Sequence, residues 1–240
     1  MRDKLALLAL TLLFFFTAGN LFTGAVPEGA SFDFNSTESL PVKSVGTITT
    51  AGGSFTVVNL NVTNQNSRWK AYVGNATGTL TLQDGNNYTI YDWSVSAPAG
   101  EVYATRGSSV TWASIRCAGV SNVTSEQTAL NISTLKDDSI NNTFLNNSHK
   151  AMVVGDIILS NSSCFSIATY VNSTAQASDE NALFQELLLS DVNNIVYSTI
   201  IENNRPGYNN ASLDFQMIVP DYGNETITSD VPYYFYIELS

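Results

Sequence analysis

The sequence predicts an all-β protein, built as an antiparallel β-sandwich of the jelly-roll or immunoglobulin-like type. Three observations favour this class. Apolar and polar residues alternate with a period of two in many short segments, turn-forming residues separate these segments, and helical patterns are few and short. Apolar residues make up 44% of the chain, which is enough to fill the core of one domain.

The N-terminal segment has the layout of a secretory signal. Two basic residues precede an unbroken apolar run over residues 5–16, and small and polar residues follow it. Cleavage could follow Gly19 or Ala25. Without cleavage, residues 5–26 are long enough to cross a bilayer. We therefore expect residues 1–19 to be a signal peptide or a retained hydrophobic anchor, with the remainder of the chain extracellular or at the cell surface.

Two further segments complete the expected organisation. Residues 20–44 contain Pro27, Pro41 and acidic side chains but little apolar periodicity, which indicates an extended N-terminal arm or linker. Residues 45–240 show no repeat of fixed period and suit a single β-sandwich domain.

The strands of this domain are predicted from alternation. Residues 58–63 and 79–83 each place apolar side chains on one face, and the turn sequence of residues 84–87 connects the second segment to residues 88–93 as a hairpin. Further strands are expected at residues 101–105, 110–117, 151–160 (divided by Gly155), 164–171, 195–201, 213–219 and 233–239.

Two short helices are compatible with the pattern. Residues 124–130 open with a Thr124 and Gln127 pair that is typical of a capping box. Residues 179–189 follow Ser178 and fit a second helix, or equally a buried strand preceded by a loop.

Acceptor sites for N-linked glycans are unusually dense. With 25 Asn among 240 residues, and 51 Ser or Thr, chance predicts about five Asn-x-Ser/Thr triplets. The chain has more than twice that number, which favours a glycoprotein exposed outside the cell over accidental triplets on an Asn- and Thr-rich surface. The acceptors are Asn35, Asn61, Asn75, Asn87, Asn122, Asn131, Asn141, Asn146, Asn161, Asn172, Asn210 and Asn224.

Charge and cysteine content narrow the class further. The net charge is −11 although only 13% of the residues are charged, so the surface repels nucleic acid and anionic lipid. We expect no nucleic-acid partner, and membrane contact only through the N-terminal segment if it is retained. Cys117 and Cys164 form an even pair in an exported chain, which predicts one disulfide rather than a metal or redox site.

The side chains that most often carry chemistry have simpler structural interpretations here. His149 is the only histidine, and its polar neighbours favour a loop residue over a catalytic base. Calcium binding and glycoside hydrolysis are alternatives that no ligand series or fixed carboxylate spacing supports. We predict no catalytic residue, no metal and no cofactor. The aspartates considered for calcium are Asp84, Asp137, Asp138 and Asp156, and the carboxylates considered for hydrolysis are Asp179, Glu180, Glu186 and Asp214.

Aromatic side chains offer another candidate surface. Trp69, Trp93 and Trp112 stand in strand segments, where packing in the core is the simpler interpretation. In residues 233–239, alternation separates Tyr234 and Tyr236 from the apolar face of the strand. These two tyrosines are therefore the possible binding surface, either for sugar rings or for a subunit contact.

The short N-terminal signal, the arm, the cysteine pair and the Asn- and Thr-rich strands together resemble the small exported, acceptor-rich β-sandwich glycoproteins of archaeal surfaces, including filament and pilus subunits. In those filament proteins an N-terminal strand of one subunit completes the sheet of the next, and the resemblance implies the same for residues 20–44. Strand addition of this kind is held by main-chain hydrogen bonds.

These observations lead to one expectation and two alternatives. We expect a non-enzymatic extracellular structural glycoprotein that self-associates in a filament or surface layer, or binds other cell-surface proteins. A carbohydrate- or partner-binding adhesin module is the alternative, and a glycoside hydrolase is the remote one.

Overall fold

The computed structural model describes residues 26–32, 36–38, 47–59, 68–86, 88–95, 97–222 and 230–239. The predicted signal or anchor and most of the arm lie outside these residues. So do the greater part of the strand expected at residues 58–63 and four glycan acceptors, which are Asn35, Asn61, Asn87 and Asn224.

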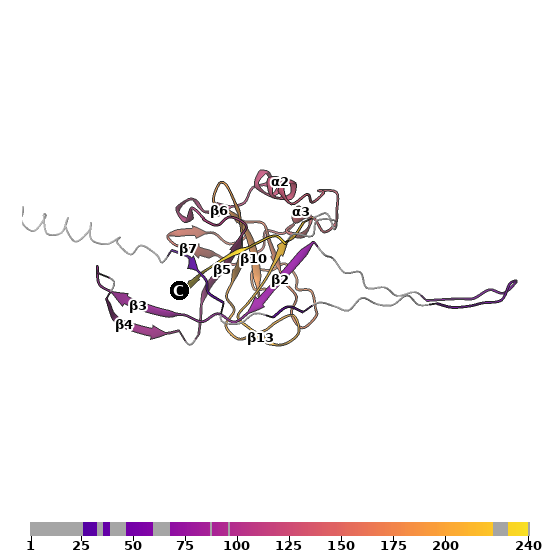
Figure 1. Ribbon diagram of the computed structural model, residues 1–240, viewed down its shortest axis with the longest axis horizontal. Helices are drawn as coiled ribbons and strands as arrows, with labels where there is room; N and C mark the ends of the chain where they lie inside the picture. Colours follow the sequence, from indigo (N-terminus) through magenta and orange to yellow (C-terminus); the bar gives the residue numbers. More distant parts are fainter. Residues whose placement is uncertain are drawn as a thin grey trace, which may run out of the picture.

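One antiparallel sheet forms the centre of the molecule (Figure 1). Its strand order is β1-β15-β5-β11-β10-β6, and β9 pairs with β10 beside this path. The strands are β1 (Glu28–Gly29), β5 (Gly100–Thr105), β6 (Arg116–Cys117), β9 (Ser166–Ala168), β10 (Gln185–Ser190), β11 (Ile195–Ile200) and β15 (Tyr234–Leu239). Strands from both ends of the sequence meet in it, since β5 pairs with β15 over six positions.

Both faces of this central sheet are covered. Every residue of β5 and β10 is buried, so these strands are not half-buried strands with a polar outer face. One face carries Val102, Leu188 and Tyr197 and packs against a second sheet and two helices. That second sheet pairs β2 (Trp69–Gly74) with β14 (Phe215–Pro220), and the helices are α2 (Val120–Ala129) and α3 (Ile140–Thr143).

The other face of the central sheet lies under a hairpin. Tyr103, Leu187 and Val196 pack here against a cluster that includes Met152 and Leu159. These come from β7 (Met152–Val154) and β8 (Ile157–Leu159), which are joined by a turn in which Gly155 has a φ of 57°. A short 3₁₀ turn, η1 (Trp112–Ser114), adds its indole to this layer. The arrangement is a β-sandwich in which the second sheet is small and open in the described part of the chain.

Two elements project from this body at opposite ends of its long axis (Figure 1). The first is the hairpin of β3 (Thr79–Gln83) and β4 (Thr89–Ser94). The second is a narrow ribbon formed by residues 47–59, with a turn at Gly52 and Gly53. A small pair, β12 (Arg205–Pro206) with β13 (Ser212–Leu213), completes the strands.

The all-β antiparallel class, the disulfide and the short helix near residues 124–130 are confirmed, whereas one strand prediction is wrong and one open alternative is decided. Residues 110–117 contain η1 and the two-residue β6 instead of one strand, because the chain turns to place Trp112 against Tyr103. Residues 179–189 are not a helix: a turn leads into β10, the buried strand that the pattern allowed equally.

The confirmed helix α2 starts earlier than the expected capping pair. Gly119 is its N-cap, and the Oδ1 of Asn122 accepts a hydrogen bond from the Gly119 N–H at 3.0 Å. Thr124 instead donates its hydroxyl to the Val120 carbonyl at 2.9 Å. Arg106 connects β5 to this helix through a two-pronged ion pair with Glu126, with both N–O distances 2.7 Å.

Candidate functional site

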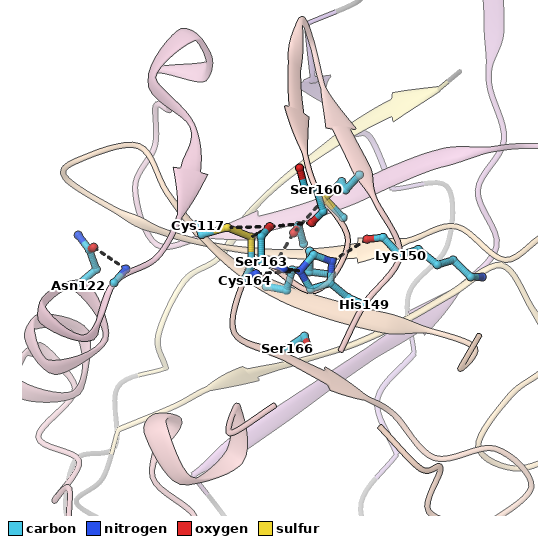
Figure 2. Close-up of a disulfide and its surroundings, with 12 residues drawn as sticks. Cys117, Asn122, His149, Lys150, Ser160, Ser163, Cys164 and Ser166 are labelled. Atoms are coloured by element: carbon cyan, nitrogen blue, oxygen red, sulfur yellow. Dashed lines mark hydrogen bonds between the residues drawn. A yellow bond between two sulfur atoms is a disulfide. The ribbon is translucent and has the colours of Figure 1, made fainter. Parts of the chain in front are cut away.

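The predicted disulfide joins Cys117 and Cys164 (Figure 2). Cys117 lies in β6, opposite Leu189 of β10, while Cys164 lies just before β9, whose Ser166 is opposite Leu187. The covalent bond therefore links the two short strands that flank the same edge of β10. A disulfide in this position holds these two short strands together at the sheet edge.

His149 holds the backbone beside this disulfide (Figure 2). Its ring is fully buried, and its Nε2 accepts hydrogen bonds from the N–H groups of Ser163 at 2.9 Å and Cys164 at 2.8 Å. Since backbone N–H groups only donate, Nε2 carries no proton, and the Nδ1–H donates to the Lys150 carbonyl at 2.6 Å. His149 is a loop residue, as expected, but a buried one whose ring nitrogens are both engaged.

A pair of buried carboxyl groups lies under the β7–β8 hairpin and was not anticipated. Glu101 of β5 is directly opposite Glu238 of β15. Glu238 accepts hydrogen bonds from the Tyr103 hydroxyl at 3.1 Å and from the Gly155 N–H at 3.0 Å. Glu101 accepts one from the Val153 backbone. The two acids thus anchor the hairpin turn. Their only signal in the sequence was a Glu within each apolar strand.

Burial sets the protonation of these acids. Burial, together with the neighbouring charge of Glu238, raises the pKa of Glu101 to about 8, against the opposing effect of the hydrogen bond from Val153. Burial also raises the pKa of Glu238, against the opposing effect of its hydrogen bonds from Gly155 and Tyr103. At neutral pH Glu101 is mostly a neutral acid, beside the carboxyl group of Glu238 that accepts hydrogen bonds from Tyr103 and Gly155.

The four carboxylates considered for glycoside hydrolysis lie in separate surroundings. Glu186 is fully buried under β14, where its Oε2 accepts the Ile218 N–H at 2.8 Å and burial raises its pKa well above the ordinary value. Asp214 is buried and accepts the N–H groups of Ala76 and Asn204. Asp179 and Glu180 lie in an exposed turn. The structure does not bring these four side chains together in one cleft.

The aspartates considered for calcium binding are also dispersed. Asp84 closes the β3–β4 turn by accepting the N–H groups of Asn86 and Tyr88. Asp138 forms an ion pair with Arg68, and Asp137 and Asp156 are exposed. Within the described residues no group of three metal-ligating side chains converges.

The aromatic side chains divide between core and surface. Trp112 packs between Tyr103 and Tyr236, with ring centroids 5.1 and 5.2 Å away, and the Tyr236 hydroxyl donates to the Ser108 carbonyl. The alternation predicted for β15 is present, because Phe235, Ile237 and Leu239 pack on the opposite face from Tyr236. Of the two tyrosines proposed as a binding surface, only Tyr234 is exposed.

The other two tryptophans also divide between core and surface. Trp69 packs against Phe144 and donates its Nε1–H to the Asp138 carbonyl at 2.8 Å. Trp93 is half-exposed on the projecting hairpin, beside Tyr91 at a centroid distance of 4.6 Å and an interplanar angle of 57°. The tilt means that these two rings do not form the flat platform on which sugar rings stack.

The described glycan acceptors are accessible. Asn122 is half-buried, and the other seven of the eight described acceptors are exposed: Asn75, Asn131, Asn141, Asn146, Asn161, Asn172 and Asn210. Three of these seven adopt a positive φ in turns, with values of 54° at Asn131, 47° at Asn172 and 64° at Asn210. Asn tolerates this conformation better than most residues, so turn geometry also favours Asn at these positions.

Two small concave features lie in the described part of the chain. An apolar cavity of about 130 Å³ lies between α2, α3 and β10, lined by Val123, Phe144 and Leu188 together with other uncharged residues. A polar one of about 120 Å³ surrounds the Arg106–Glu126 pair. Neither approaches the size of a typical site for a drug-sized ligand, roughly 300–1,000 Å³.

The arm meets the sheet edge at β15. Glu28 is opposite Ile237 and Gly29 is opposite Tyr236, and the Ala30 N–H donates to the Phe235 carbonyl at 3.0 Å. Phe32 then packs edge-on against Phe235, with centroids 5.4 Å apart. A short segment of the N-terminal arm thus acts as an added edge strand, which makes this edge the principal candidate interface.

Comparison with protein-family models, with curated proteins and with solved structures gives no match. In the described part of the chain, no helix is both long and apolar enough to span a bilayer.

Proposed function

We propose that this protein is an extracellular, glycosylated structural subunit that self-associates at a cell surface. The observation that carries the proposal is the addition of residues 28–30 to the edge of β15. Main-chain hydrogen bonds hold this strand, so the same contact can form within a copy or between copies. Residues 31–68 separate the added strand from β2, a length of chain that permits exchange between neighbours.

The surface supports an extracellular setting. Seven described acceptor asparagines are exposed, most of them outside helices and strands, and the disulfide fits an oxidising compartment. With few charged residues and a net charge of −11, solubility rests largely on neutral polar groups and the proposed glycans. The sugar-binding alternative lacks comparable support, because the exposed Tyr91 and Trp93 rings are inclined by 57°.

The test is the assembly state of the full chain after loss of one main-chain hydrogen bond. Ala30→Pro removes the N–H that donates to Phe235, so we expect a smaller assembled fraction by light scattering and electron microscopy. Ser31→Pro is the matched control, because the same ring is introduced one position beyond that bond. An unmodified chain that stays monomeric at all concentrations, or equal assembly of both variants and the unmodified chain, would contradict the proposal.

A further inference from the structure

The β3–β4 hairpin exposes an apolar face. Leu82 is opposite Tyr91 in the register, and Trp93 lies on the same face two residues further along β4. These side chains are 51%, 56% and 49% exposed. The other face is mostly polar and includes the pair of Thr81 and Asp92. In the described part of the chain, neither strand pairs with a third strand. An isolated two-stranded hairpin is only marginally stable in water, so an apolar cover on this face would stabilise it.

The ribbon of residues 47–59 exposes apolar side chains at the opposite end of the molecule (Figure 1). Phe55 is fully exposed and Val57 is 93% exposed, and alternation places them on one side of the ribbon. The ribbon is closed by hydrogen bonds from the Ser54 N–H to the Ala51 carbonyl, at 3.3 Å, and between the hydroxyls of Thr56 and Thr50, at 2.7 Å. The ribbon is therefore a hydrogen-bonded turn that exposes apolar side chains.

Charge favours an uncharged element of the same chain as the occupant. Residues 44–67 contain no charged side chain, although the whole chain has a net charge of −11. Two acidic copies repel each other wherever charged surfaces meet. Contact between the ribbon and the Leu82, Tyr91 and Trp93 face places no charged side chain of the ribbon against the hairpin.

Length and position favour a second copy. Residues 54–59 span ~20 Å when extended, which matches the six residues of β4. Hairpin and ribbon lie at opposite ends of the body, so they do not meet within one copy (Figure 1).

We infer that the apolar face of the β3–β4 hairpin receives the 47–59 ribbon of a second copy, with Phe55 and Val57 packed against Leu82, Tyr91 and Trp93. This contact is heterologous, because each copy offers a different surface at each end. A heterologous contact that does not close into a ring produces an open filament. The inference rests on the proposed function and gives self-association a second contact, remote from the β1–β15 edge.

The first test substitutes each side of the contact in the full chain. Phe55→Ser and Trp93→Ser should each raise the protein concentration needed for half-assembly by at least about tenfold, and the double variant should add little to either. Ile158→Ser is the matched control, because Ile158 is 74% exposed but lies in β8, outside both surfaces of the proposed contact. Circular dichroism of each variant checks that the domain remains folded.

A second test does not depend on loss of assembly. A Phe55→Cys chain mixed with a Tyr91→Cys chain should give a disulfide-linked dimer under mild oxidation, whereas either chain alone should give much less. Assembly that is lost in Ala30→Pro but unchanged in Phe55→Ser and Trp93→Ser would overturn this inference and leave the proposed function standing. A chain that never assembles would overturn both. Binding of the monomer to uncharged lipid vesicles through Phe55, without cross-linked dimers, would identify the ribbon as a membrane contact and also overturn the inference.

Discussion

A single buried residue helps to hold the sheet edge together, although the sequence pattern did not predict its burial. His149 stands in a polar stretch typical of an exposed loop, yet its imidazole is fully buried and accepts the N–H groups of Ser163 and Cys164. Alternation of apolar and polar residues cannot reveal this role, because it depends on a backbone turn formed 14 residues later. A buried N–H that lacks a partner costs roughly 1–3 kcal/mol, so the ring stabilises the segment before Cys164.

Glu101 makes the stability of the fold depend on pH. Its pKa is about 8 in the folded chain against an ordinary value of 4.5, because burial and Glu238 disfavour the charged form. The folded state therefore holds a proton that the unfolded state releases as pH rises through this interval. The free energy of unfolding should fall by up to about 1.4 kcal/mol per pH unit from this group between pH 4.5 and 8, then level off.

Urea unfolding of Glu101→Gln across this pH interval measures the contribution. The variant should lose part of the slope of the unmodified chain, while Glu28→Gln, at an exposed position, should keep it. A slope that is the same in Glu101→Gln and in the unmodified chain would show that Glu101 is ionised in the folded state. Glu186 and Glu238, whose pKa values are also raised by burial, supply the slope that remains.

At the scale of elements, the sequence predicted most strands, including the fully buried β5, but left β10 open between strand and helix. The β3–β4 hairpin and β15 follow their expected segments closely. β10 is buried at every position, so its apolar run lacked the period that separates strand from helix. The strand expected at 110–117 is interrupted because Trp112 turns to pack on Tyr103 and Tyr236. Such long-range packing leaves no local signal.

The start of β5 depends on a glycine. Gly100 has a φ of 127°, and a Cβ at this position would lie 2.0 Å from the Glu238 carbonyl oxygen. Gly100→Ala should therefore lower the free energy of unfolding by roughly 2 kcal/mol or more, since both the backbone conformation and the β15 backbone resist the methyl group. Denaturant titration measures the change. Gly85→Ala, in open space at the β3–β4 turn, should have a much smaller effect, and equal stability of Gly100→Ala and the unmodified chain would refute this account.

In the whole molecule, the most informative contacts join residues far apart in the chain. Glu101 and Glu238 meet because β15 returns to pair with β5, and the arm meets β15 at the same sheet edge. Alternation and turn residues predicted the fold class, and the expected export of the chain supplied the argument for a disulfide. Strand order, which decides the acid pair and the candidate interface, arises from packing of the entire chain. That is why Tyr236, expected at the surface, lies against Trp112 instead.

The disulfide is where this whole-chain connectivity can be tested. Cys117 and Cys164 are 47 residues apart, and closing a loop of this length should contribute about 4 kcal/mol to the free energy of unfolding in the chain-entropy model. Cys117→Ser should lower stability by that order under oxidising conditions and release one titratable thiol. Cys164→Ser and the double variant should lower the free energy of unfolding by the same amount, because all three remove the same bond. Two free thiols in the unmodified native protein would show that the bond is absent.

The same variant tests whether assembly depends on this bond. If self-association proceeds through exchange of the N-terminal strand, the Cys117→Ser chain should still assemble below its unfolding temperature. The reason is that β6 and the segment before β9 lie at the opposite edge of the sheet from β1.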